Sequence, residues 1–218
     1  MRLRRKAWID EAILQYRDIL FLEVPEGIAG HWRNLFPHPE RPLYVELGTG
    51  KGQFISRMAA MHPDVNFVGI EREQGVIYYA AKKTAESETP LSNVRLLLVD
   101  AKDLETIFAP GEIDGLFLNF SDPWPKARHY KRRLTYRENL DHYASLLTKG
   151  GKLVFKTDNR GLFAFTVEEL AARKWTISAL TLDLHAHPAA GDAMTEYEEK
   201  FSRKGNAICR LVAAKPEP

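Results

Sequence analysis

The sequence predicts a doubly wound α/β fold with one mostly parallel, seven-stranded sheet and helices on both of its faces. From about residue 42, short apolar runs alternate with longer amphipathic stretches, which is typical of strand and helix alternation. The first apolar run, 43–47, ends in a glycine-rich turn, as a buried parallel strand does before a helix. No linker rich in proline, glycine or serine divides residues 42–213, so these residues form one domain.

The elements follow in order along that domain. Strands are expected at 43–47, 65–70, 94–99, 113–120 and 152–157, with two further β-rich runs at 175–184 and 206–213. Helices are expected at 53–62, 73–85, 136–147 and 162–173. The first of them places Phe54, Ile55 and Met58 on one face, and Pro63 ends it. Residues 1–41 are assigned to a basic N-terminal arm and residues 42–218 to the domain itself.

The net charge hides an uneven distribution. The 218 residues contain 31 Lys and Arg and 29 Asp and Glu, a formal charge of +2. Nine cations and no acid, however, occupy two short segments, 2–6 (Arg2, Arg4, Arg5, Lys6) and 126–133 (Lys126, Arg128, Lys131, Arg132, Arg133). The rest of the chain carries 22 bases and 29 acids, a charge of −7. An acidic body with two basic patches favours a specific polyanionic partner.

Composition excludes several classes of protein. The hydrophobic fraction of 44% is enough for a sizeable core, which argues against disorder. No apolar run is long enough for a membrane span, and no secretory signal follows the basic start. The single cysteine, Cys209, excludes a disulfide framework and favours a buried structural thiol in the cytoplasm. His185 and His187 lack a nearby acid or cysteine at metal-ligand spacing, so no metal site is expected.

A cofactor site is expected at the carboxyl ends of the first strands. Gly48 and Gly50 allow a sharp turn and a close approach to a ligand. The loop lacks the Gly-Lys-Ser/Thr of a Walker A motif, and Gln53 stands where a dinucleotide fingerprint has its third glycine. Three carboxylates at strand ends, Glu46, Glu71 and Asp100, would repel a diphosphate and attract a cation. S-adenosylmethionine, with an adenosine, an ammonium and a sulfonium, suits such a site.

The fourth strand leads into the second candidate region. There Asp122, Trp124 and Lys126 precede the basic segment, and prolines on both sides of Trp124 stiffen the backbone. A carboxylate can accept hydrogen bonds from guanine, an aromatic ring can stack on a base, and cations can bind phosphates. The pattern therefore predicts a pocket for a nucleobase on a phosphate chain.

The sequence resembles the bacterial tRNA (guanine-N7)-methyltransferases, which are class I S-adenosylmethionine-dependent enzymes with a Rossmann-like fold. The resemblance is carried by four segments in the family's order, between about residues 43 and 212. They are ELGTGKGQF from Glu46, NFSDPWPKARHYKRRLT from Asn119, FKTDN from Phe155 and TEYEEKF from Thr195. The second segment is the most specific.

The resemblance implies a role for each matching residue. Cofactor binding is implied for Glu46, Gly48, Gly50, Glu71, Asp100 and Asp122, and catalysis for Asp122. Contacts with the tRNA substrate are implied for Lys126, Arg128, His129, Lys131, Arg132, Arg133, Asp158, Thr195, Glu196, Tyr197 and Glu198. The implied product is 7-methylguanosine at position 46 in the variable loop of tRNA, made by a cytoplasmic monomer or homodimer.

Three other interpretations remain open from the residues. Ser-Asp-Pro-Trp is similar to the loops of methyltransferases that act on exocyclic amines. An RNA-binding module without catalysis is a second interpretation, and Asp122 argues against it. An NAD-linked oxidoreductase is the third, and Gln53 argues against it.

Overall fold

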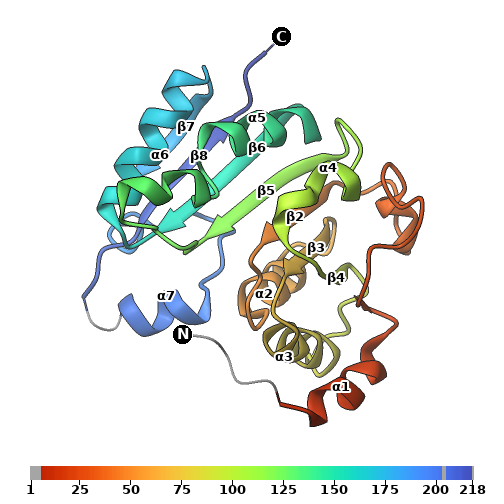
Figure 1. Ribbon diagram of the computed structural model, residues 1–218. Coiled ribbons are helices and arrows are strands. Elements are labelled where there is room, and N and C mark those ends of the chain that lie inside the picture. The colour runs from red at the N-terminus through yellow and green to blue at the C-terminus, as the bar shows by residue number, and fades with distance from the viewer. Residues whose placement is uncertain (1–5, 203–204, 218) are drawn as a thin grey trace.

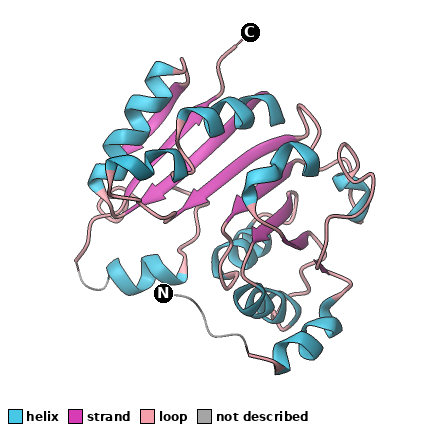
Figure 2. Cartoon of the chain, viewed as in Figure 1, coloured by secondary structure: helices cyan, strands magenta, loops and turns pink. Residues whose placement is uncertain are grey.

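One eight-stranded sheet runs through the protein in a computed structural model that describes residues 6–202 and 205–217 (Figures 1 and 2). Its strand order is β1-β4-β3-β2-β5-β6-β8-β7. The strands are β1 (Leu20–Phe21), β2 (Leu43–Leu47), β3 (Asn66–Glu71), β4 (Val94–Leu98), β5 (Ile113–Asn119), β6 (Leu147–Thr157), β7 (Thr176–Thr181) and β8 (Cys209–Ala214). The α/β class and the mostly parallel sheet expected from the sequence are confirmed, with one strand more than predicted.

The sheet reverses its direction of growth between β2 and β5. The strands β1 to β6 are joined by parallel pairing, whereas β8 pairs antiparallel with both β6 and β7. The chain builds outward from β2 through β3 and β4, then returns to place β5 on the other side of β2. Ligands of open α/β sheets bind where the strand order reverses, outside the carboxyl ends of the strands.

Helices cover both faces and enclose two hydrophobic clusters. One cluster joins the sheet to α4 (Leu104–Ile107), α5 (Arg137–Leu146) and α6 (Arg160–Ala172). The other joins it to α1 (Trp8–Ala12), α2 (Gln53–Met61) and α3 (Gln74–Ala85). Figure 1 shows these two groups of helices on opposite sides of the strands. Apolar residues in the central strands bury their side chains on both faces of the sheet, which explains why the sequences of these strands are continuous apolar runs.

The N-terminal segment packs against this domain. It forms α1, the 3-10 helix η1 (Ile13–Tyr16), β1 and the 3-10 helix η2 (Trp32–Leu35). Trp32 is completely buried, and its indole donates a hydrogen bond of 2.8 Å to the carbonyl of Ile107. The carboxylate of Glu112 accepts bonds from the backbone amides of Gly30 and Trp32. This segment supplies β1, the strand beyond the predicted seven; Arg2, Arg4 and Arg5 lie outside the described residues.

The short helix α4 was not predicted, and neither was α7 (Glu196–Ser202), although the sequence of α7 carries a start signal. The Thr195 hydroxyl accepts a bond from the Glu198 amide at 2.9 Å, and the Glu198 carboxylate accepts one from the Thr195 amide at 3.4 Å. This reciprocal arrangement is a capping box, whose signature is Ser or Thr followed three residues later by Glu. Among the described residues, no helix combines the length and apolar character that crossing a membrane requires.

Candidate active site

A cleft of about 280 Å³ opens where the strand order reverses. Its walls come from the loop after β2, the start of α2, the end of β5 and the start of α7. The lining residues are Glu46, Gly48, Thr49, Gly50, Lys51, Gly52, Gln53, Phe54, Val76, Asn119, Phe120, Thr195, Glu196 and Tyr197. The structure thus brings the first, second and fourth sequence motifs to one place.

The loop after β2, residues 48–52, is called the glycine loop here. Its backbone has a conformation that favours glycine at every second position. Gly48, Gly50 and Gly52 have φ angles of 76°, 60° and 79°. The amides of Gly48 and Thr49 both donate to the carbonyl of Ile70, which fixes the loop on the neighbouring strand β3. At Gly52 an added Cβ would lie 2.8 Å from the Cα of Ala80, so this glycine also allows α2 and α3 to pack closely.

Glu46 is the buried carboxylate of the cleft. Its side chain accepts hydrogen bonds from the Thr49 hydroxyl at 2.6 Å and from the Asn119 amide at 2.8 Å. The residue is only 3% exposed. Burial raises the pKa of Glu46 to about 7, although both hydrogen bonds and the charge of Lys156 act to lower it. Glu46 therefore changes charge near neutral pH.

The polar groups of the cleft fit the expected cationic nucleoside. Asn119 Oδ1 is buried and has no hydrogen-bond partner in the described part of the chain, so it can accept a bond from a bound ammonium group. Glu71 stands at the end of β3, with its carboxylate 3.2 Å from the Gly50 amide and within reach of the amides of Arg72 and Glu73. A carboxylate has acceptor capacity beyond these bonds, as ribose hydroxyls would require.

Two predicted carboxylates, in addition to Glu71, lie outside the lining of the cleft. Asp100, after β4, is half-buried and pairs with Lys102 at 3.7 Å. Asp122 is exposed, two residues beyond Phe120, on the loop that leaves β5. The exposure of Asp122 suits a side chain that meets a substrate entering from solvent.

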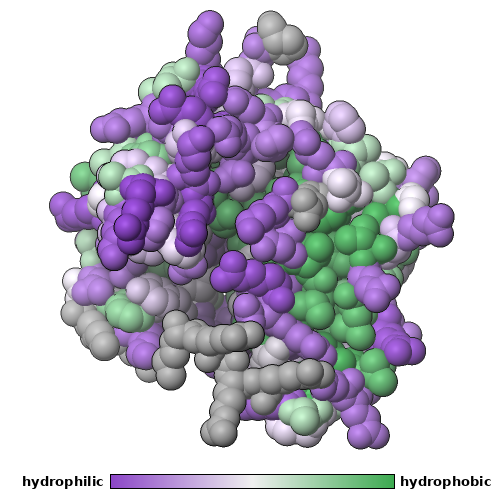
Figure 3. All heavy atoms as spheres, in the orientation of Figure 1, coloured by the Kyte–Doolittle hydropathy of each residue, from purple (hydrophilic) through white to green (hydrophobic). Residues whose placement is uncertain are grey.

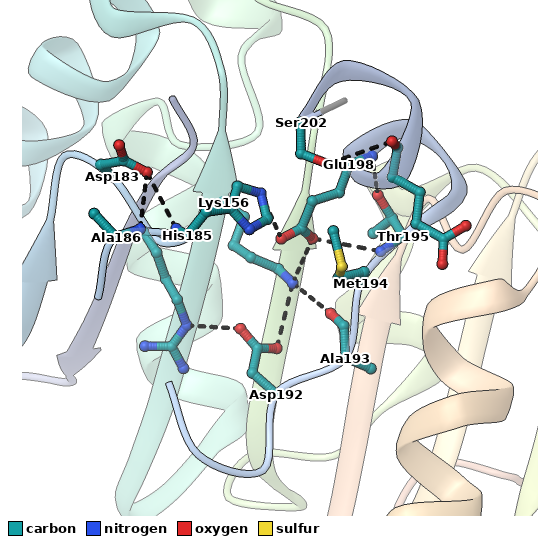
Figure 4. A network of polar contacts seen from close by, with 12 residues as sticks. Lys156, Asp183, His185, Ala186, Asp192, Ala193, Met194, Thr195, Glu198 and Ser202 are labelled. Atoms are coloured by element: carbon teal, nitrogen blue, oxygen red, sulfur yellow. Dashed lines mark hydrogen bonds and ion pairs between the residues drawn. The ribbon is translucent and has the colours of Figure 1, made fainter. Parts of the chain in front are cut away.

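The helix α7 is attached to three elements through the three glutamates of its first turn. Glu196 pairs with Lys83 of α3, Glu199 with Arg57 of α2, and Glu198 with Lys156 of β6. The Lys156–Glu198 pair is the buried one, and Figure 4 shows it within a larger network. Lys156 Nζ also donates to the Ala193 carbonyl at 2.7 Å and contacts Asp192 at 3.3 Å. Glu198, expected to contact the substrate, thus has its carboxylate engaged inside the protein.

The ring of Tyr197 lies beside the end of β5. Its centroid is 4.9 Å from that of Phe120 and 4.1 Å from that of Phe201. Its hydroxyl donates to Asp158 at 3.2 Å, and burial together with Asp158 raises the pKa of Tyr197. Two residues predicted to bind substrate, Asp158 and Tyr197, are therefore direct partners at the cleft.

The basic segment 126–133 forms the 3-10 helix η4 (Ala127–Arg132) beside Trp124. Arg132 lies over the Trp124 ring at 4.9 Å, and His129 meets its edge at 5.7 Å. Lys126, Arg128, Lys131 and Arg132 are exposed. In Figure 3 the most hydrophilic side chains of this face gather over η4. Arg133 differs from its neighbours in being buried, with 6% exposure.

Several cleft residues were not predicted from the sequence. Asn119 and Phe120 begin the most specific motif, and their place at the carboxyl end of a strand was the available signal. Lys156, which lies outside the cleft lining but pairs with Glu198, carried another signal: a lysine inside an apolar strand points to a buried partner. Within residues 6–202 and 205–217, no three His, Cys, Asp or Glu side chains come together as a metal site would require.

Comparison with known proteins identifies relatives across almost the whole chain. Residues 40–211 match a family described as "Putative methyltransferase". A tRNA (guanine-N(7)-)-methyltransferase of Geobacillus thermodenitrificans is 49% identical, and the match covers 99% of this chain and 98% of that protein. A protein of the same name from Streptococcus uberis is 44% identical, with coverage of 98% and 99%.

Solved structures share the fold at low sequence identity. The structure of an antibiotic-related methyltransferase aligns with a TM-score of 0.59 at 17% identity, covering 98% of this chain and 95% of that one. The 16S rRNA methyltransferase KamB aligns with a TM-score of 0.61 at 14% identity, covering 81% and 88%. At these identities the likeness describes the fold alone.

Proposed function

The chain belongs to the family of tRNA (guanine-N(7)-)-methyltransferases, and from that membership we propose that it methylates N7 of guanine at position 46 in the variable loop of tRNA. S-adenosylmethionine is the methyl donor, as expected from the sequence. The observation that carries the proposal is the junction at the end of β5. Asn119 and Phe120 line the cleft there, and Asp122 and the basic segment continue from the same strand.

The cofactor would be held by groups on both sides of the cleft. Glu46 and the unpartnered oxygen of Asn119 are acceptors for its ammonium group, and Glu71 is an acceptor for its ribose hydroxyls. Gly48 and Gly50 present backbone without side chains to it. When bound, S-adenosylmethionine supplies an electrophilic methyl group attached to a sulfonium.

The protein needs no general base for this reaction. N7 of guanine carries a lone pair and no proton, so it is nucleophilic as it stands. Methylation makes the purine ring cationic, and the Asp122 carboxylate can stabilise that charge as it develops. Orientation of the two reactants accounts for about 7–11 kcal/mol of barrier lowering in well-organised sites. Asp122 is therefore assigned to electrostatic stabilisation and orientation.

The RNA contacts belong to the exposed cations and the aromatic groups near them. Lys126, Arg128, Lys131 and Arg132 can bind phosphates, which fixes the orientation of an RNA without reading its sequence. Trp124 and His129 lie among these cations. Thr195, Glu196 and Tyr197 line the cleft, and Asp158 accepts a hydrogen bond from Tyr197; a carboxylate here can accept hydrogen bonds from the donor edge of guanine. A cytoplasmic location remains part of this proposal.

The proposed position is tested with two unmodified tRNA transcripts that differ only in having guanosine or adenosine at position 46. Methyl transfer from labelled S-adenosylmethionine is measured for both. Transfer to the guanosine transcript alone supports the proposal. Equal transfer to both would place the target elsewhere in the tRNA.

A further inference from the structure

The loop that carries Asp122 has an unusual backbone at both of its ends. Phe120 and Trp124 have φ angles of 52° and 39°, although neither is a glycine. Residues other than glycine rarely adopt this left-handed region of backbone conformation, and they stay there only when their surroundings impose it. Ser121, Asp122 and Pro123 lie between these two points. The conformation that presents Asp122 therefore depends on contacts from outside the loop.

Arg133 supplies such contacts at the far end of the loop. Its Nε donates to the carbonyl of Pro123 at 2.9 Å, and its Nη2 donates to the carbonyl of Trp124 at 3.2 Å. The guanidinium carbon lies 3.9 Å from the ring centroid of Tyr130 and 4.3 Å from that of Phe165. Two hydrogen bonds and two aromatic rings thus fix one side chain to the loop, to η4 and to α6.

These contacts make Arg133 a poor phosphate ligand. Its neighbours Arg128, Lys131 and Arg132 are exposed, whereas Arg133 is buried. In the described part of the chain it forms no ion pair, so its hydrogen bonds go to the carbonyls of the loop. A guanidinium can do this because its donors form a rigid planar fork that also stacks on rings, which a lysine ammonium cannot reproduce.

We propose that Arg133 is a positioning residue, which holds the Phe120–Trp124 loop in the strained conformation that presents Asp122 to the substrate. This inference rests on the proposed function. According to this inference, Arg133 is not one of the RNA contacts expected from the sequence. It affects turnover because its hydrogen bonds to the carbonyls of Pro123 and Trp124 hold the loop that carries Asp122. The competing arrangement is a nucleotide that enters the hollow of about 380 Å³ lined by Arg133, Pro125, Tyr130 and Phe165 and contacts the guanidinium there.

Two substitutions separate geometry from charge. Arg133→Lys keeps the positive charge and loses the planar set of guanidinium donors, and Arg133→Gln loses both. The matched control is Arg95→Lys, because Arg95 also donates to backbone carbonyls, those of Ser92 and Val94, and lies 5.0 Å from the Phe36 ring. Arg95 is on β4, outside the cleft lining. The measurements are kcat, KM for tRNA, the salt dependence of tRNA binding and the melting temperature of each variant.

Both Arg133 variants are expected to lower kcat by about tenfold to a hundredfold, as small misplacements of reacting groups do. Their tRNA affinity and salt slope should stay near wild type, and Arg95→Lys should lose thermal stability without losing kcat. A salt slope lower by about 1 in Arg133→Gln, with activity kept in Arg133→Lys, would show a phosphate contact and overturn the inference. Equal kcat values for Arg133→Lys and Arg95→Lys would also overturn the inference. No 7-methylguanosine from the wild type would overturn the proposed function and this inference together.

Discussion

Lys156 and Glu198 form an ion pair of 3.1 Å in the interior, where their side chains are 0% and 1% exposed. The pair joins a central strand, β6, to α7, the helix that borders the cleft. Because the Glu198 carboxylate also accepts the bond from the Thr195 amide in the capping box, one carboxylate both stabilises the start of α7 and attaches the helix to the sheet (Figure 4).

Replacing one partner of this pair should destabilise the protein strongly. Lys156→Met leaves the Glu198 carboxylate buried without its cation, which typically costs about 3–5 kcal/mol. The control is Lys82→Met, which removes an exposed pair with Glu86 on α3 and should cost at most about 1 kcal/mol. Urea unfolding of the two variants measures both values. Similar free energies of unfolding would show that burial of the pair has no energetic consequence.

Cofactor binding should strengthen as pH rises through neutrality. The pKa of Glu46 is raised to about 7, so this group is largely protonated at pH 6 and ionised at pH 8. The ionised form attracts the cationic cofactor, which predicts up to about tenfold tighter binding at pH 8. Calorimetry with S-adenosylmethionine at both pH values measures the change.

Glu46→Gln provides the control for that titration. It should bind the cofactor more weakly, and any pH dependence it retains belongs to the ligand or to other groups. The same substitution tests stability: a raised folded-state pKa means that ionisation of Glu46 destabilises the fold, so the wild type loses stability from pH 5 to pH 8. A variant that loses stability as steeply as the wild type would contradict this assignment.

Asp122→Asn should impair chemistry far more than binding. The substitution keeps the size of the side chain and removes the charge that stabilises the methylated purine, so kcat should fall by about 10²–10³-fold. The dissociation constant for tRNA should stay within about twofold of wild type. Single-turnover rates and filter binding separate the two quantities, and an equal loss in both would make Asp122 a binding residue.

Arg132→Ala should weaken RNA binding in a salt-dependent way. The exposed guanidinium over Trp124 is expected to bind a phosphate, so its removal should lower the salt slope by about 1. Lys149→Ala is the matched control, because it removes an exposed cation near the amino end of β6, whereas η4 follows the carboxyl end of β5. If both variants have the wild-type slope, Arg132 contacts no phosphate.

The sequence allowed the sheet and the glycine loop to be predicted because their signals are local. Apolar runs mark the strands, and the positive φ angles at Gly48 and Gly50 match residues that tolerate them. The N-terminal segment was harder, because the burial of Trp32 depends on contacts with residues more than seventy positions away, such as Ile107 and Phe108.

The less predictable features depend on long-range packing. Arg133 lies in a run of cations that reads as solvent-exposed, and its burial requires Phe165, which comes from a later helix. The positive φ angles of Phe120 and Trp124 have no sequence signal, since neither residue favours that conformation. The helix α7 could have been predicted, because Thr195 and Glu198 carry the capping-box spacing.

The identity of the methylated nucleoside tests the central claim most directly. The protein is incubated with unmodified tRNA and S-adenosylmethionine, the tRNA is digested to nucleosides, and the products are identified by mass spectrometry against standards. The account predicts 7-methylguanosine as the product. A methyladenosine, a guanosine methylated on its exocyclic amine, or no methylated nucleoside at all would contradict it.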